Sequence, residues 1–208
     1  MNGRYNMVLS GVGGQGLMLL SNVIGTACAQ EGLPVITGEQ HGLSQRSGSI
    51  SVHLRMGEGT YGPLVPPGDA DVMIAMEATE ALRYIEFLRD DGYIIMNTRL
   101  MHHPLETMRH VREDAATEPY FSLDEVRKRV RSVTPNVLEV DALHLAEAAG
   151  NARAENVVLL GAACGLPGFP LKKETVKDVI GGVVPEKTID ANMKAFDAGD
   201  GACCDAFG

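Results

Sequence analysis

The chain has 208 residues, of which 45% are hydrophobic and 22% are charged, and its formal net charge at pH 7 is -9. This length and composition support one globular domain with a buried core and exclude wholesale disorder. The acidic balance, without a basic stripe, argues against a nucleic-acid-binding protein, because such proteins need Lys and Arg to neutralise phosphates.

Neither the start of the chain nor its apolar stretches indicate export or membrane insertion. Residues 1–5 run directly into a strand-like segment, and no signal peptide is readable. The apolar run over residues 17–29 is amphipathic, and it is shorter than the roughly 20 residues that cross a bilayer. We therefore expect a cytoplasmic protein with no membrane partner.

The beginning of the chain follows the pattern strand, glycine turn, helix, strand. Residues 6–10 and 33–37 are short apolar strand candidates, and residues 17–30 carry apolar side chains at helical spacing. Between them, residues 11–16 match G-x-G-x-x-G, whose glycines permit a tight turn and the approach of a phosphate to the helix amino terminus. These segments predict a βαβ unit with a right-handed crossover.

The pattern then changes. Residues 49–55 alternate polar and apolar side chains, which predicts a half-exposed antiparallel strand. Further strands are predicted at 71–76, 92–97 and 136–140, and helices at 77–88, 122–131, 142–149, 156–164, 171–180 and 185–198. The fold class is thus α/β. We expect one Rossmann-like domain over residues 1–199, with a mainly parallel sheet, helices on both faces, a non-standard insert after the second strand, and a flexible tail at 200–208.

The four cysteines are Cys28, Cys164, Cys203 and Cys204, and no two of them form a C-x-x-C pair. Iron–sulfur clusters and structural zinc sites need several ligands at short, regular spacing. We therefore expect no metal or cluster on this chain. Cys28 and Cys164 have the pattern of small core residues, whereas Cys203 and Cys204 are expected to be exposed thiols, with a redox role as the alternative.

The glycine turn has two interpretations. A dinucleotide site adds an acidic residue about 20 residues further on for a ribose hydroxyl, and Glu39 could fill that role, which would make the chain a stand-alone NAD- or FAD-binding protein. Against this, the strand pattern breaks after Glu39, and the chain is too short for a second, substrate-holding domain. The other interpretation is that the glycines only let the helix pack closely on the sheet.

Residues 39–49 hold the densest set of polar groups, and they begin at the carboxyl end of a strand, where ligands bind in open α/β sheets. Arg46 could bind a phosphate or carboxylate through two hydrogen bonds, and His41 could donate a hydrogen bond or act as a base. The alternative is a surface loop whose side chains satisfy its own backbone. We favour a ligand or subunit contact, and we assign no catalytic residue because no nucleophile–base pair is recognisable.

Together, residues 11–16 and 39–49 resemble the gamma-type subunit of pyruvate and 2-oxoacid:ferredoxin oxidoreductases, with the small subunit of indolepyruvate ferredoxin oxidoreductases as the nearest match. The resemblance continues through residues 63–66, 70–72, 77–84, 92–98, 156–163 and 184–196. It implies an oxidoreductase subunit of a complex that oxidatively decarboxylates 2-oxoacids, here aryl pyruvates, to acyl-CoA.

In that family, thiamine diphosphate, Mg²⁺ and the iron–sulfur clusters belong to other subunits or domains. The resemblance therefore implies a large thiamine and iron–sulfur subunit as the partner, indirect contact with ferredoxin, and an isolated chain that is inactive or could form a homodimer. It also implies a contact with coenzyme A. The candidate cofactor-binding residues are Gly11, Gly13, Gly14, Gln15, Gly16, Glu39, His41, Gln45, Arg46, Gly48 and Ser49.

Overall fold

The computed structural model describes residues 3–42, 48–59, 61–101 and 121–207. Within these ranges one sheet has the strand order β2-β3-β1-β4-β5-β6. Its strands are β1 (Tyr5–Val12), β2 (Val35–His41), β3 (Ser49–Met56), β4 (Ala70–Ala75), β5 (Leu88–Asn97) and β6 (Val137–Val140).

The sheet is mainly parallel, with one antiparallel insertion. β1, β4, β5 and β6 pair in parallel, whereas β3 pairs antiparallel with both β1 and β2. The expected insert after the second strand is therefore confirmed. The predicted βαβ unit is present in split form: β1 and β2 are parallel and are joined by α1, but β3 lies between them in the sheet. The chain turns back after β2, and β3 takes the place next to β1 since its apolar residues Val52 and Leu54 fill the core there.

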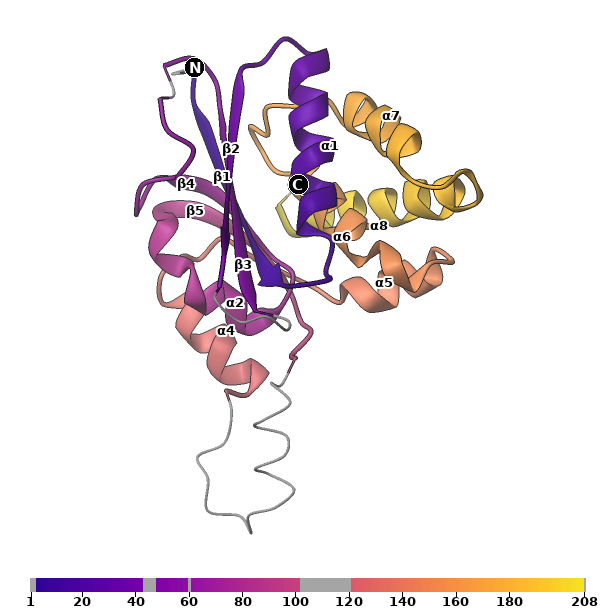
Figure 1. Cartoon of the computed structure of the whole chain (residues 1–208). Helices are drawn as coiled ribbons and strands as arrows, with labels where there is room; N and C mark the ends of the chain where they lie inside the picture. The colour runs from indigo at the N-terminus through magenta and orange to yellow at the C-terminus, as the bar shows by residue number, and fades with distance from the viewer. Residues whose placement is uncertain (1–2, 43–47, 60, 102–120, 208) are drawn as a thin grey trace.

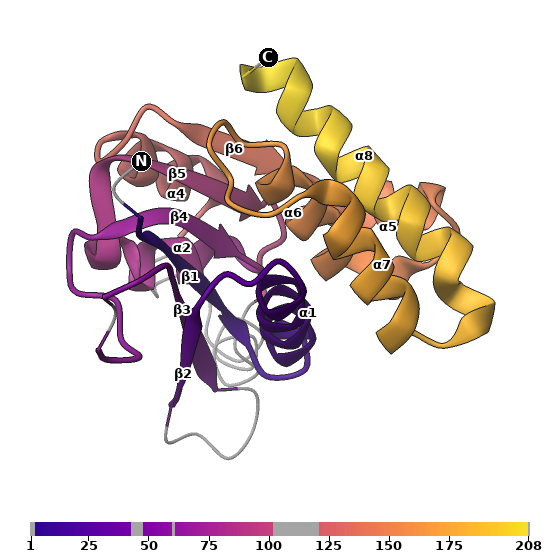
Figure 2. The ribbon, with the colours of Figure 1, turned by 90° about the horizontal axis from the view of Figure 1, so that it is seen from above.

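Helices cover both faces of the sheet, as predicted (Figures 1 and 2). Side chains of a strand point alternately to the two faces, so Leu9 and Ile74 pack into the larger helical layer, while Val8 and Met73 pack into the smaller one. The larger layer contains α1 (Leu17–Gln30), α5 (Ala142–Ala148), α6 (Glu155–Cys164), α7 (Lys173–Val183) and α8 (Ile189–Phe207), and the smaller contains α2 (Ala78–Arg83) and α4 (Leu123–Arg131). None of the helices in the described ranges is both long and apolar enough to span a bilayer.

Local signals explain where two of these helices begin. The Ser122 hydroxyl accepts a hydrogen bond from the Glu125 N–H, and the Glu125 carboxylate accepts one from the Ser122 N–H, so the predicted capping box opens α4. Glu77 is the N-cap residue of α2, and its carboxylate accepts hydrogen bonds from the Thr79 and Glu80 N–H groups. The helix predicted at 77–88 is shorter than expected: it ends at Arg83, the short 3₁₀ helix η1 (Ile85–Phe87) follows, and β5 already begins at Leu88.

β3 is more buried than its alternating pattern suggested. Its polar residues Ser51 and His53 are fully buried, and the loop around Val65 and the ring of Phe87 cover His53. The His53 and Phe87 rings meet edge to face with their centroids 4.9 Å apart. The expected half-exposed strand is therefore wrong, and the polar face of β3 is an internal hydrogen-bonded surface.

The expected flexible tail at 200–208 is also corrected, since α8 continues to Phe207. Cys203, expected to be exposed, is fully buried, while Cys204 is exposed as predicted. The Lys173 Nζ lies 2.6 Å from the Asp200 Oδ1, which ties this end of α8 to α7. Gly199 does not stop the helix: it lies where α8 crosses α6, and a Cβ there would collide with the carbonyl oxygen of Val158.

Candidate functional site

The glycine turn connects the carboxyl end of β1 to the first turn of α1. Gly14 and Gly16 have φ angles of 94° and 82°, in the left-handed region that L-residues rarely adopt. The Gly16 carbonyl accepts the first helical hydrogen bond, from the Leu20 N–H at 3.2 Å. The predicted strand–turn–helix geometry is therefore present, at the sheet edge where open α/β sheets bind ligands.

The side chain of Gln15 fills the inside of this turn. Its Oε1 accepts a hydrogen bond from the Val12 N–H at 2.8 Å, and its Nε2 donates to the Met76 carbonyl oxygen at 3.3 Å. A Cβ placed on Gly11 would lie 2.6 Å from the Gln15 Oε1 and 2.9 Å from the Met76 Cβ. Gly11 is therefore required to make room for a side chain of the protein itself.

Gly16 has the same role towards Asn156, a buried residue in the first turn of α6. The Asn156 Nδ2 donates to the Gly16 carbonyl oxygen at 3.4 Å, and a Cβ on Gly16 would collide with that amide nitrogen. The glycine lets the amino-terminal ends of α1 and α6 meet. At Gly11 and Gly16, then, the structure supports the packing interpretation of the glycines.

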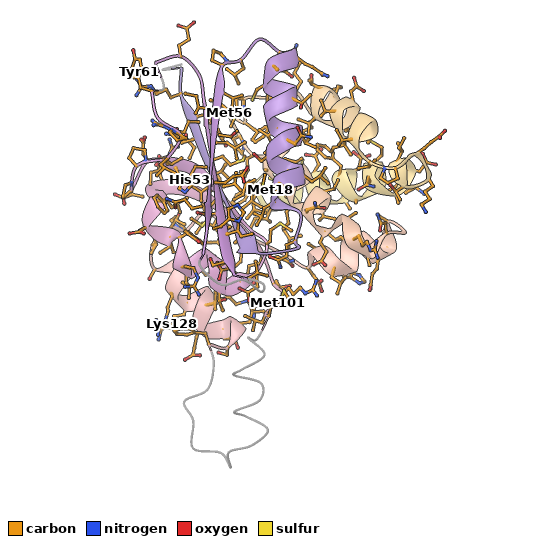
Figure 3. The ribbon with its side chains drawn as sticks, viewed as in Figure 1. Met18, His53, Met56, Tyr61, Met101 and Lys128 are labelled. Atoms are coloured by element: carbon orange, nitrogen blue, oxygen red, sulfur yellow. The ribbon has the colours of Figure 1, made fainter. Side chains whose placement is uncertain are left out.

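Gly14 differs, because no atom lies within 4 Å of the position that its Cβ would take. It borders an open cavity of about 390 Å³, and the lining residues are Gly13, Gly14, Gln15, Met76, Arg99, Met101, Ala152, Arg153, Glu155 and Asn156. Figure 3 shows Met101 at this end of the sheet, opposite the end that carries Tyr61.

The electrostatics of this cavity favour an anion. α1 and α6 both begin here, and neither has a side-chain hydrogen bond from its N-cap residue, so the positive ends of their dipoles face the same space. In α6 the Val157 N–H is already bonded to the Asn156 Oδ1 at 2.9 Å. Two guanidinium groups line it, and one of them, that of Arg99, is paired with the Glu155 carboxylate at 2.6 Å. Arg153 is exposed and is the second cation.

Two polar residues that we did not single out from the sequence hold the walls of the cavity. The Glu77 carboxylate accepts hydrogen bonds from the Thr79 and Met101 N–H groups at 2.8 and 2.9 Å. The Asn97 Nδ2 donates to the Met76 carbonyl oxygen at 3.2 Å. Asn97 ends one predicted buried strand and Glu77 directly follows another, so their positions at the carboxyl edge of the sheet were a usable signal.

The residues of the predicted polar loop, 39–49, lie in different parts of the structure. Glu39 and His41 belong to the end of β2, are exposed, and contact each other with 3.3 Å between the Glu39 Oε2 and the His41 Nε2. β3 separates them from β1, and strands are spaced about 4.8 Å apart, so Glu39 lies about 10 Å from the glycine turn across the sheet. A carboxylate in that position does not fit the ribose-binding acid of a dinucleotide site. Gln45 and Arg46 lie outside the described residues.

The other end of the loop does meet the glycine turn. The Gly48 carbonyl oxygen accepts a hydrogen bond from the Gly13 N–H at 3.2 Å. The Ser49 hydroxyl donates to the buried carboxylate of Glu80 in α2 and lies 2.8 Å from the hydroxyl of Tyr84. The structure thus brings Gly48 and Ser49 to the turn and anchors them on α2, whereas Glu39 and His41 lie apart.

Burial shifts the pKa values of several ionisable groups in the described ranges. Burial raises the pKa of the Cys28 thiol to about 12 and that of the Cys203 thiol to about 11, so both stay protonated at neutral pH. Burial lowers the pKa of His53, whose Nδ1 accepts a hydrogen bond from the Val65 N–H at 3.2 Å. Across the described ranges, no group of three or more His, Cys, Asp or Glu residues is placed to hold a metal ion.

Known proteins share this sequence and fold. The chain is 44% identical to the indolepyruvate oxidoreductase subunit IorB of Thermococcus kodakarensis, over 98% of both chains. The keto/oxoacid ferredoxin oxidoreductase gamma subunit of Geobacter sulfurreducens superposes with a TM-score of 0.70 at 20% identity, over 97% of this chain and 99% of that one. A second solved structure is the 2-oxoglutarate:ferredoxin oxidoreductase of Magnetococcus marinus with 2-oxoglutarate, coenzyme A and succinyl-CoA bound. It superposes with a TM-score of 0.71 at 20% identity, over 99% of this chain and 32% of that one.

The two solved structures share the fold of this chain, and the second shows that the same fold also occurs as one part of a much longer polypeptide. The family model described as pyruvate ferredoxin/flavodoxin oxidoreductase matches residues 6–201, which is nearly the whole chain and includes the glycine turn and the cavity beside it. The chain belongs to the pyruvate ferredoxin/flavodoxin oxidoreductase family.

Proposed function

We propose that this chain is the small, gamma-type subunit of a 2-oxoacid:ferredoxin oxidoreductase that acts on indolepyruvate or a similar aryl pyruvate. The observation that carries the proposal is the 44% identity to the IorB subunit over 98% of both chains. The complex would convert the 2-oxoacid and coenzyme A into acyl-CoA and CO₂, and it would pass two electrons to ferredoxin.

In this proposal the chemistry belongs to the partner. Thiamine diphosphate, Mg²⁺ and the iron–sulfur clusters reside on a large subunit, in the cytoplasm, and this chain completes the assembly. The described part of the chain offers no metal-binding cluster, and its buried thiols have raised pKa values. A stand-alone NAD- or FAD-binding protein fits less well, because Glu39 is two strands away from the glycine turn.

The chain's contribution to coenzyme A binding would be the cavity at the glycine turn. Two uncapped helix amino termini and the Arg153 guanidinium face this space, and an acyl-CoA-forming enzyme must hold a phosphate-rich cofactor. Gly14 leaves the backbone open to such a ligand. Gly13, Gln15 and Gly16 then act mainly by fixing the shape of the turn.

The test is reconstitution with the large subunit encoded by the same organism. The mixture should oxidise indolepyruvate in a coenzyme A-dependent reaction, and Arg153→Ala should raise the apparent KM for coenzyme A several-fold. Lys128→Ala, which removes an exposed cation from α4, is the matched control and should leave that KM unchanged. Reconstitution without activity towards any 2-oxoacid would contradict the proposed function. An unchanged KM in Arg153→Ala would contradict only the placement of coenzyme A.

A further inference from the structure

β2 is the outermost strand of the sheet, and its free edge is long and regular (Figure 2). All seven of its residues pair with β3 in one uninterrupted register, from Val35 opposite Met56 to His41 opposite Ile50. No bulge twists this edge away, which is the condition under which a strand can serve as a template for another strand.

Two hydrogen bonds show which backbone groups of β2 point outwards. The Gly42 N–H donates to the Ser49 carbonyl oxygen at 2.9 Å, and the Gly57 N–H donates to the Pro34 carbonyl oxygen at 2.8 Å. Pairs in an antiparallel ladder alternate between bonded and non-bonded, so the even-numbered residues of β2 bond to β3. The N–H and C=O groups of the odd-numbered residues therefore face the free edge: Val35, Thr37, Glu39 and His41.

Within the described ranges, none of these outward-facing groups has a hydrogen-bond partner. Val35–His41 contains no proline and no lysine, the two residues most often used to protect an exposed edge, and its carboxylate is that of Glu39. The strand at the opposite edge of the same sheet is shorter, because β6 has only four residues. The exposed length of β2 is therefore a particular property of this edge.

The surroundings of the edge specify what could pair with it. On the side of the smaller helical layer, Pro63 packs on Gly38, and the same loop carries Leu64 and Tyr61 with 44% and 95% of their surface exposed. On the other side, the exposed Glu39 carboxylate lies next to His41. A matching strand would place apolar side chains against the loop and a Lys or Arg opposite Glu39.

We propose that the free edge of β2 accepts an extended strand of the large subunit, which continues the sheet across the subunit interface. This inference rests on the proposed function, which requires a large partner. The choice of occupant agrees with the Magnetococcus enzyme, in which the same fold makes up 32% of one longer chain and is joined to further polypeptide. The Glu39 carboxylate adds charge complementarity for a basic strand rather than for a second copy of β2 in a register that places two Glu39 side chains opposite each other.

The experiment compares Thr37→Pro with Thr37→Ala in the full chain. Both variants lose the threonine side chain, but only proline removes the outward N–H, and proline is tolerated where the N–H of an edge strand faces solvent. We expect Thr37→Pro to weaken binding of the large subunit at least tenfold while its urea midpoint stays close to that of Thr37→Ala. Thr37→Ala should bind like the unmodified chain.

Amide hydrogen exchange on the unmodified chain gives a second readout that does not depend on a variant folding. In the isolated chain, the amides of Thr37, Glu39 and His41 should exchange fast and those of Ile36 and Gly38 slowly. In the complex all of them should be slow. Equal binding of the large subunit by the proline and alanine variants would overturn the proposal, and so would fast exchange of the Thr37 and Glu39 amides in the complex. The proposal would also be overturned if Thr37→Pro disrupted a homodimer of this chain but left binding of the large subunit unchanged. Failure of the unmodified chain to bind the large subunit would instead overturn the proposed function.

Discussion

The two positive-φ glycines of the turn, Gly14 and Gly16, provide a matched pair for testing what the turn is for. Alanine at either position must adopt a left-handed conformation, which costs roughly 1–2 kcal/mol. Only at Gly16 would the new methyl group also collide with a neighbour, the side-chain amide of Asn156. Gly14 faces open space.

The collision at Gly16 adds the cost of overpacking a buried contact, about 1–3 kcal/mol. Gly16→Ala should therefore lose about 2–5 kcal/mol of unfolding free energy, against about 1–2 kcal/mol for Gly14→Ala. Each kcal/mol corresponds to roughly 2–4 °C in Tm for a protein of this size. Removing the Asn156 side-chain amide should restore the part of the unfolding free energy that the collision costs, since the Asn156 Cβ would lie 3.9 Å from the new methyl group.

The assay is urea unfolding of the two single variants, of Asn156→Ala and of the double variant Gly16→Ala/Asn156→Ala. The double variant should lose less unfolding free energy than the two single variants lose together, because the two residues are in contact. Equal losses for Gly14→Ala and Gly16→Ala, or strict additivity in the double variant, would refute the view that Gly16 is needed to accommodate Asn156.

Three further outcomes test other parts of the fold. Gly199→Ala should destabilise the chain by about 1–3 kcal/mol by pushing α8 from α6, whereas Gly201→Ala, with no atom within 4 Å of its new Cβ, should stabilise it by up to about 1 kcal/mol; equal effects in urea unfolding would mean that α8 does not cross α6 here. Burial lowers the pKa of His53, so the unfolded chain binds a proton at higher pH than the folded one, and the unfolding free energy should fall as the pH drops below about 6.5; His53→Gln should flatten that dependence, and an unchanged slope would exclude this histidine as its source. Ser49→Ala removes a hydrogen bond to the buried Glu80 carboxylate and should cost about 1.5–3 kcal/mol, which an unaltered urea midpoint would contradict.

The sequence was most informative where local chemistry decides the structure. The glycine turn, the Ser122–Glu125 capping box and the apolar α6 could be predicted because each depends on residues close together in the chain. The antiparallel strand was found from its alternation. The burial of this strand could not be predicted, because His53 is covered by Val65 and Phe87, which no local pattern connects to β3.

The site was harder to predict for the same reason. Asn156 reaches Gly16 from the other end of the chain, and the Arg99–Glu155 pair joins two segments that the sequence keeps far apart. The helix predicted at 185–198 ended too early, directly before Gly199, since a glycine that lets two helices cross has the same sequence signature as a C-cap. Position alone cannot separate those two uses of glycine.

The most direct test of the central claim, that this chain is a subunit whose chemistry takes place on its partner, is a ferredoxin-reduction assay with indolepyruvate and coenzyme A. It is run on the purified chain, on the large subunit, and on the two together. We predict no turnover by the purified chain and full, coenzyme A-dependent activity only when both are present. Ferredoxin reduction by this chain alone, or full activity of the large subunit without it, would contradict the claim.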